Sequence, residues 1–262
     1  MTKGELKAMA ALAADLAVKA GAILRRGFNH VRWIDYKGRI NPVTDYDLKA
    51  ERFITRKISA AYPDHEILAE EAGAGGRGSE FRWIIDPLDG TVNYAHGFPV
   101  YCVSIALEYF GEVVAGAVYD PERNELFYSV RGTRALLNGR PITVSPETRL
   151  ERALLATGFA YDIGTARRNN LGLFARMARR AQAIRRPGSA ALDLCWLACG
   201  RIDGFWELKL HPWDTAAATL IVANAGGKVT RINGKPFSIF DADVLASNGR
   251  IHGTMQRVLT RR

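Results

Sequence analysis

The chain has 262 residues, of which 48% are hydrophobic and 24% are charged, and its formal net charge is +9. This composition excludes a disordered or fibrous protein and is typical of a chain that buries a large core. No apolar run is long enough to cross a bilayer, so we expect no membrane association. The positive balance suits anionic substrates, and it also suits nucleic acid or acidic protein partners.

The first element is predicted to be an amphipathic helix over about residues 4–26. Its apolar positions recur at helical spacing, at Leu6, Met9, Ala13, Leu16, Ala20 and Ile23. Asp15 and Lys19 interrupt the segment, so it lacks the apolar stretch of a signal peptide. We therefore expect the first helix of the fold, in a protein that stays in the cytoplasm.

The rest of the first half is expected to form one helix and then a sheet. Helix 45–61 is followed by strands 66–69, 82–86, 100–109, 113–119 and 125–130. The glycine-rich segment 73–79 is interpreted as an exposed loop. Its G-x-G-x-x-G spacing is interpreted as accidental, because a strand pattern rather than a helix follows it. These patterns predict an antiparallel meander rather than a series of βαβ units.

The second half alternates helices with shorter strands. Strands are expected at 153–157, 203–208, 228–232 and 244–246, and helices at 164–182, 189–199, 212–225 and 250–260. Together the two halves predict an α+β fold with two sheets flanked by helices. We place a boundary after residue 148, between an N-terminal α+β subdomain (1–148) and a C-terminal α/β subdomain (149–262).

Cysteine usage gives no sign of a disulfide framework or a zinc site. The three cysteines are Cys102, Cys195 and Cys199. The last two are four residues apart in a helical pattern, which is not the usual spacing of structural zinc ligands. We interpret all three as small buried core residues.

Two aspartates follow an apolar strand in segment 83–93, whose sequence is WIIDPLDGTVN. A proline stops the strand after Asp86, and Asp89 comes three residues later, so both carboxylates can face one point. Gly90 lets a ligand approach the backbone closely, and Thr91 starts a helical turn whose free N–H groups suit a phosphate. Two like charges repel unless a cation lies between them, and hard oxygen ligands favour Mg²⁺ over zinc.

Three further segments place acids at strand ends or helix starts. These acids are Glu70 and Glu71, Asp45 and Asp47, and Asp214. Each of them alone is explained as well by capping, because an Asp at a helix N-terminus is usually just a cap. The segment containing Asp86 and Asp89 is different, since two acids, a proline and a glycine within six residues are poorly explained by capping.

Taken together, these segments resemble the inositol monophosphatase family. Residues 83–99, WIIDPLDGTVNYAHGFP, are similar to its first signature, and residues 213–227 are similar to its second. Residues 41–47 and 69–71 match its remaining acidic segments. The order and spacing agree over nearly the whole chain. The resemblance implies the layered αβαβα sandwich shared by inositol monophosphatases and fructose-1,6-bisphosphatases.

The resemblance also implies that the acids hold two or three Mg²⁺ ions. Glu70, Asp86 and the Leu88 carbonyl would bind the first ion, and Asp86, Asp89 and Asp214 would bind the second. A third, weaker ion would lie near Glu70. Two ions suit the hydrolysis of a phosphate monoester, because one lowers the pKa of a water molecule and the other stabilises the leaving oxygen.

Further implied roles concern the water and the phosphate. Thr91, with Glu70 or Asp47, would orient the attacking water, and the N–H groups of Gly90 and Thr91 would bind the phosphate. No protein nucleophile is needed, and no Ser-His-Asp or cysteine-based set is apparent in the sequence. The family also implies lithium sensitivity and a homodimer.

The substrate is expected to be a small phosphorylated polyol or sugar. The residues that match the polyol-binding positions of the family are Asp89, Gly188, Ser189, Ala190 and Glu207. A carboxylate at position 207 favours a neutral polyol over a second phosphate, which it would repel. This favours myo-inositol 1-phosphate. The alternative explanation of Glu207 is a surface acid paired with Lys209.

Other functions are left open by the sequence. On the same scaffold they are fructose-1,6-bisphosphatase, histidinol phosphatase and 3′-phosphoadenosine phosphatase activities. Some bacterial relatives also bind the transcription machinery, and the arginine cluster between Arg176 and Arg186 would suit such a nucleic-acid or protein partner, although we favour a solvated helix face. An aspartyl-phosphate mechanism on Asp45 and Asp47 is disfavoured, because that pair opens a helix instead of following a buried strand.

Overall fold

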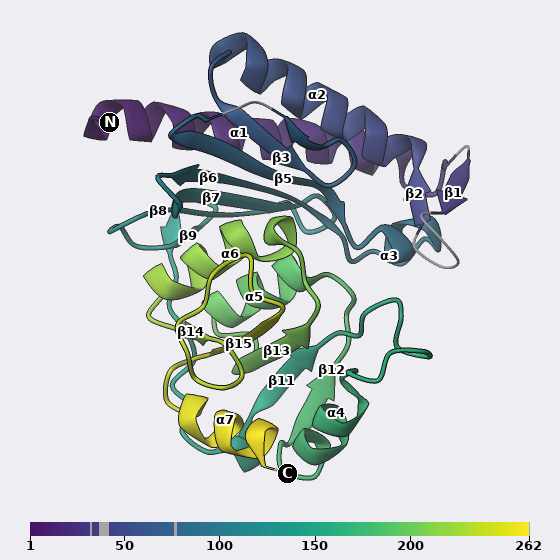
Figure 1. The fold of residues 1–262 in the computed structure, drawn as a ribbon, viewed down its shortest axis with the longest axis vertical. Coiled ribbons are helices and arrows are strands. Elements are labelled where there is room, and N and C mark those ends of the chain that lie inside the picture. The colour runs from purple at the N-terminus through teal and green to yellow at the C-terminus, as the bar shows by residue number, and fades with distance from the viewer. Residues whose placement is uncertain (32, 37–41, 76–77, 262) are drawn as a thin grey trace.

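The structure is a computed structural model that describes residues 1–31, 33–36, 42–75 and 78–261. These residues form five stacked layers in which helices and sheets alternate (Figure 1). Helices α1 (Lys3–Gly27) and α2 (Asp45–Ala61) form the first layer, α5 (Ala190–Ala198) and α6 (Pro212–Asn224) the middle one, and α4 (Leu171–Ala178) and α7 (His252–Thr260) the last. The predicted αβαβα sandwich is confirmed.

The first sheet has eight strands in the order β10-β9-β8-β7-β6-β5-β3-β4. They are β3 (Glu66–Ala69), β4 (Gly73–Gly75), β5 (Phe81–Asp89), β6 (Cys102–Tyr109), β7 (Glu112–Asp120), β8 (Glu125–Val130), β9 (Leu136–Leu137) and β10 (Arg140–Pro141). Every neighbouring pair is antiparallel except β3 and β5, which are parallel. Because parallel strands end at the same edge of a sheet, the residues after β3 lie beside the end of β5.

Helices α1 and α2 begin with capping boxes that the sequence supplies locally. Thr2 and Glu5 exchange hydrogen bonds at the start of α1, and Thr44 and Asp47 do the same at the start of α2. The buried face of α1 packs across β6 and β7. No helix in the described ranges is both long and apolar enough to span a membrane.

The middle layer is apolar on nearly every side because it has a sheet on each face. All of α5 except Trp196 is buried. Helix α6 comes very close to β7 at Gly116, where a methyl group would lie 2.7 Å from the Ala217 carbonyl oxygen and 2.8 Å from its Cα. The absence of a side chain at Gly116 therefore sets the distance between this helix and the first sheet.

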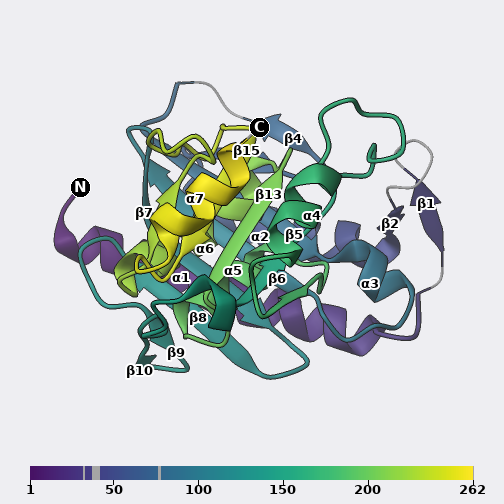
Figure 2. The same ribbon diagram turned by 90° about the horizontal axis from the view of Figure 1, so that it is seen from below.

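The second sheet has five strands in the order β12-β11-β13-β15-β14. They are β11 (Leu154–Thr157), β12 (Ala183–Arg185), β13 (Gly204–Leu208), β14 (Lys228–Thr230) and β15 (Asp243–Ser247). Successive side chains on β13 serve different layers: Phe205 packs with the middle helices, and Trp206 packs with the cluster under α4 and α7. Figure 2 shows these two outer helices side by side across the sheet.

The largest error of the sequence-based prediction concerns residues 158–182. The pattern predicts a helix over 164–182, whereas α4 covers only Leu171–Ala178 and β12 follows it. The physical reason is Asn170, whose Nδ2 donates to Thr157 Oγ1 and to the Gly158 carbonyl and whose Oδ1 accepts from Trp206 Nε1, each over 2.7 Å. These bonds hold the residues before α4 as a loop against the ends of β11 and β13.

Several short elements were also missed. Strands β1 (Ile34–Tyr36) and β2 (Pro42–Thr44) pair with each other, and the 3-10 turn η1 (Leu150–Arg152) connects larger elements. The helical turn predicted to start at Thr91 is confirmed as α3 (Thr91–Ala95). The segment interpreted as an exposed glycine-rich loop contains β4, and its residues 76–77 lie outside the described ones. Cys102 and Cys195 are buried as predicted, and Cys199 is half-buried.

The close approach at Gly116 predicts a specific loss of stability. In Gly116→Ala, the added methyl group must push α6 from β7, so we expect the free energy of unfolding to fall by about 1–3 kcal/mol in a urea titration. Gly172→Ala is the matched control: it adds a methyl group in α4 with no atom within 4 Å. We expect that control to be neutral or stabilising by up to about 1 kcal/mol. Equal stability of the two variants would contradict this account of the packing.

Candidate active site

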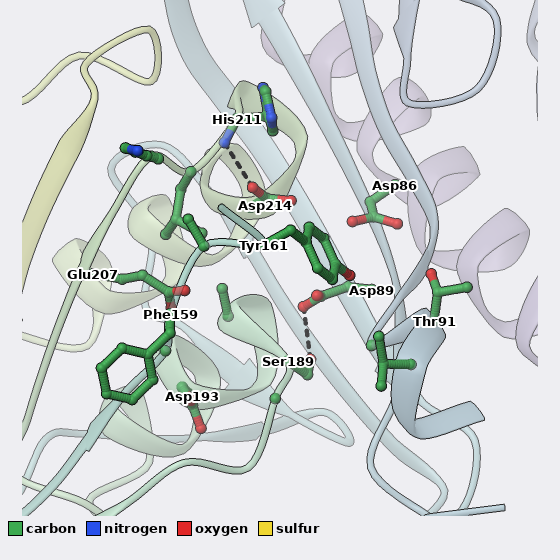
Figure 3. A pocket seen from close by; sticks show the side chains of 18 of the residues that line it. Asp86, Asp89, Thr91, Phe159, Tyr161, Ser189, Asp193, Glu207, His211 and Asp214 are labelled. Atoms are coloured by element: carbon green, nitrogen blue, oxygen red, sulfur yellow. Dashed lines mark hydrogen bonds between the residues drawn. The ribbon is translucent and has the colours of Figure 1, made fainter. Parts of the chain in front are cut away.

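One cavity of about 590 Å³ brings together residues from both halves of the chain (Figure 3). Its walls include all but one of the site residues named from the sequence: Glu70, Asp86, Leu88, Asp89, Gly90, Thr91, Gly188, Ser189, Ala190, Glu207 and Asp214. The exception is Asp47, which lies behind Thr91.

Asp86 and Asp89 enter the cavity where β5 leaves its regular pairing with β6. The register between these strands shifts between Asp86 and Asp89. The Leu88 N–H donates to Asp86 Oδ1 over 2.9 Å, so the side chain of Asp86 closes the turn. Asp86 is 1% exposed. Burial, with the charges of Glu70 and Asp89, raises the pKa of Asp86 well above its usual range.

Asp89 connects the two halves of the chain. Its Oδ2 accepts hydrogen bonds from the Ser189 hydroxyl over 2.6 Å and from the Ala191 N–H over 2.8 Å. Both donors belong to the start of α5, where Ser189 is the N-cap. Withdrawal from water raises the pKa of Asp89 to about 6, although these hydrogen bonds favour its charged form. The end of β5 and the start of α5 are therefore held at one point.

Asp214 reaches the same cavity from the first turn of α6. Its Oδ2 accepts the His211 N–H over 2.6 Å, and Pro212 occupies the first helical position. The capping role considered for this acid is therefore real. Withdrawal from water and the neighbouring Asp89 raise the pKa of Asp214 well above its usual range. A carboxylate has two oxygens, so a cap made through one of them is compatible with ligand binding through the other.

Asp47 and Thr91 form a buried polar pair beside the acids. The Thr91 hydroxyl donates to the Leu88 carbonyl over 2.9 Å and lies 3.2 Å from Asp47 Oδ1. The other oxygen of Asp47 accepts the Thr44 N–H over 2.8 Å at the start of α2. Burial raises the pKa of Asp47 to about 7. Asp47, which completes the capping box of α2, therefore also orients the Thr91 hydroxyl on the cavity wall.

The donor chemistry of this end of the cavity matches magnesium. Glu70 follows β3, where its N–H donates to the Ile85 carbonyl over 3.2 Å, next to Asp86. Carboxylate oxygens are the ligands that Mg²⁺ prefers, and a cation would relieve the repulsion that raises the pKa of Asp86. No three His, Cys, Asp or Glu side chains of the described residues come close enough to surround an ion. Backbone hydrogen bonds hold Asp86, Asp89 and Asp214 in their separate places.

Glu207 lies at the other end of the cavity. In Figure 3, Glu207 and Asp193 are on the left, and Asp86 and Thr91 are on the right. Glu207 is 8% exposed on β13, and burial raises its pKa to about 8. Lys209 pairs with Asp162 instead, so the alternative explanation of Glu207 as a surface acid paired with Lys209 is wrong.

Several residues of the cavity wall were missed from the sequence. They are Gly158, Phe159, Tyr161, Arg186 and Asp193. The first three belong to the loop before α4, part of which was wrongly predicted to be helical. Arg186 was assigned to the basic cluster. Asp193 carried a signal that could have found it, because it is the only acid in an otherwise apolar helix, α5.

Comparisons with known proteins give the same family as the residues. The model of the inositol monophosphatase family matches residues 5–261. An inositol-1-monophosphatase from Synechocystis sp. is 43% identical, over 97% of this chain and 90% of the relative. A Nus factor SuhB from Vibrio cholerae is 41% identical, over 91% of each chain. The structure of an inositol monophosphatase from Anabaena (Nostoc) sp. has a TM-score of 0.89 at 41% identity, with 97% of this chain and 96% of that one covered. The chain therefore belongs to the inositol monophosphatase family.

Proposed function

We propose that this phosphoric monoester hydrolase uses Mg²⁺ to hydrolyse a small phosphorylated polyol, with myo-inositol 1-phosphate as its best substrate. The observation that carries the proposal is the meeting of Glu70, Asp86, Asp89 and Asp214 on one cavity wall, although they come from three distant parts of the chain. Buried like charges are unfavourable alone, so their convergence indicates a bound cation. The name of the Synechocystis relative agrees with this activity.

Five groups would hold the magnesium: the carboxylates of Glu70, Asp86, Asp89 and Asp214 and the carbonyl of Leu88. When bound, the ions supply positive charge that offsets the phosphate dianion and acidifies a water molecule. The hydroxyl of Thr91, held by Asp47 and the Leu88 carbonyl, would orient that water with help from Glu70. Positioning and electrostatics account for most catalysis of phosphoryl transfer.

The phosphate would lie against the backbone of Gly90 and Thr91. Gly90 has φ of 96°, and a Cβ there would lie 2.8 Å from the Val100 carbonyl oxygen, so only glycine fits. The polyol would extend toward Gly188, Ser189, Ala190 and Glu207, with Asp89 between the two ends. A buried acid at position 207 offers no positive charge to a second phosphate, which disfavours a bisphosphate substrate.

Other parts of the proposal follow from the family resemblance. They are a homodimer, lithium inhibition and a third weakly bound ion near Glu70. The subdomain boundary between residues 148 and 149 rests instead on the change of element pattern along the sequence. Location in the cytoplasm is supported by unpaired cysteines, because all three are free thiols.

Phosphate release from a substrate panel tests the proposed activity. We expect the highest kcat/KM for myo-inositol 1-phosphate, compared with fructose 1,6-bisphosphate, histidinol phosphate and 3′-phosphoadenosine 5′-phosphate. Turnover should rise with added Mg²⁺ to a plateau and fall to background in EDTA. A preference for a bisphosphate would remove the substrate assignment and keep the enzyme class. Full turnover in EDTA would contradict the metal site.

Asp86→Asn separates the chemical role of the acids from their effect on stability. The variant loses an ion ligand, so we expect activity to fall by at least about 100-fold. It also loses a buried charge that its neighbours repel, so its melting temperature in EDTA should rise above that of the wild type. Asp15→Asn, at an exposed ion pair with Lys19, is the control and should change neither quantity. Turnover by Asp86→Asn like that of the wild type would rule out the site.

A second candidate function is a complex with the transcription machinery. The relative from Vibrio cholerae is named a Nus factor, and exposed arginines surround the end of α4 and strand β12. If this surface binds an acidic partner, purified bacterial RNA polymerase should be captured at low salt and released as salt increases. Changing Arg179, Arg180 and Arg185 to Glu should abolish capture.

Changing Arg52, Arg56 and Lys57 to Glu is the matched control, because these exposed cations lie on α2, in the layer farthest from α4. Capture by this control but not by the first triple variant supports the surface. No salt-sensitive capture by the wild type would remove the second function and leave the hydrolase proposal intact.

A further inference from the structure

The end of the cavity that contains Glu207 has a second acid to which the proposed mechanism gives no role. Asp193, on α5, is 1% exposed and lines the cavity. Among the described residues, no hydrogen-bond partner is available to its Oδ1. Three other buried side-chain atoms of the described residues have no hydrogen-bond partner: Arg176 Nε, Trp196 Nε1 and Arg231 Nε. None of these residues lines the cavity.

Helix capping does not explain Asp193. The N-terminus of α5 is already capped by Ser189, whose Oγ accepts the Leu192 N–H over 3.3 Å. The Ala191 N–H is taken by Asp89. An unpaired carboxyl in an otherwise apolar helix destabilises the folded chain, and an apolar side chain of the same size would not. The acid is therefore better explained by a ligand than by the fold.

The surroundings of Asp193 point to a neutral, hydroxylated ligand. Glu207 enters the same end of the cavity from β13, and the backbone of Gly158 passes so close that a methyl group there would overlap the Glu207 carboxylate. Arg186 also lines this end, which disfavours an ammonium group. Burial and the nearby Glu207 raise the pKa of Asp193 well above its usual range, and burial raises that of Glu207 to about 8. Protonated carboxyls of this kind both donate to and accept from hydroxyl groups.

We propose that Asp193 is a specificity-determining residue that binds a hydroxyl group of the leaving alcohol, in a subsite shared with Glu207. The inference rests on the proposed phosphatase function and deepens it, because it specifies the leaving group. That group is a neutral polyol with at least two free hydroxyls, one for each carboxyl. A second phosphate is disfavoured because neither acid offers it positive charge, and an alcohol without further hydroxyls leaves Asp193 without a partner.

The test compares two substrates that differ in their leaving groups. kcat/KM is measured for myo-inositol 1-phosphate and for p-nitrophenyl phosphate, which has no hydroxyl on its leaving group. In Asp193→Leu, we expect the ratio of the first value to the second to fall about 10- to 100-fold, mainly through a higher KM for inositol 1-phosphate. Asp193→Asn keeps a hydrogen-bonding group and should lower the ratio less. The melting temperature of Asp193→Leu should rise, because an unpaired buried acid is removed.

Gly158→Ala tests the subsite from another element without changing either acid. The added methyl group displaces the Glu207 carboxylate, so the same ratio should fall. Gly164→Ala, in the same loop, is the matched control because no atom lies within 4 Å of the added methyl group, and its ratio should equal that of the wild type.

Each other outcome overturns a distinct statement. If Asp193→Leu leaves the ratio unchanged, or lowers both substrates equally, Asp193 has no part in specificity. Histidinol phosphate is assayed as a third substrate. If Asp193→Leu loses more kcat/KM with it than with inositol 1-phosphate, the subsite binds an ammonium group and the hydroxyl assignment is wrong. If the wild type hydrolyses neither substrate with Mg²⁺ present, the proposed function fails and this inference fails with it. If the enzyme is active but Asp193→Leu has the same ratio as the wild type, only this inference fails.

Discussion

The repulsion between buried carboxylates where the two halves of the chain meet is the constraint on which the rest of the structure depends. Asp86 and Asp89 lie in the last part of β5 and Asp214 lies in the first turn of α6, so three carboxyls are withdrawn from water on the wall of one cavity. Each acid is held by a backbone N–H, from Leu88, Ala191 or His211. These hydrogen bonds fix each carboxyl at its own position on the cavity wall, where the charged forms would repel one another.

Asp89 also joins the end of β5 to the start of α5, in the other half of the chain. Asp89 accepts from the Ser189 hydroxyl, and Ser189 begins the helix that carries Asp193 at its cavity face. One carboxylate therefore fixes the end of β5 relative to the start of α5, the two segments that line the opposite ends of the cavity.

Local physical chemistry explains why most elements were predictable. The capping boxes at Thr2 and Thr44 act within a few residues, so their effect on the backbone can be derived from the sequence alone. The prediction that the proline after Asp86 ends the strand is wrong, because β5 continues to Asp89 with only a shift of register against β6. The helix predicted over 164–182 is too long because its length depends on contacts with distant residues. Asn170 makes its hydrogen bonds to β11 and to Trp206, which is 36 residues away, and no local pattern contains that information.

By itself, the sequence determined the family to which the chain belongs and predicted which acids would line one cavity, because the signatures are contiguous and rich in residue types with few structural explanations. Only the tertiary structure decided that Glu207 is buried in the cavity and not paired with Lys209, that Gly158 gives it room, and that no residue the structure describes hydrogen-bonds to Asp193 Oδ1. Burial and the absence of a partner depend on atoms brought together from distant segments. For that reason the pattern of residues along the chain does not contain them.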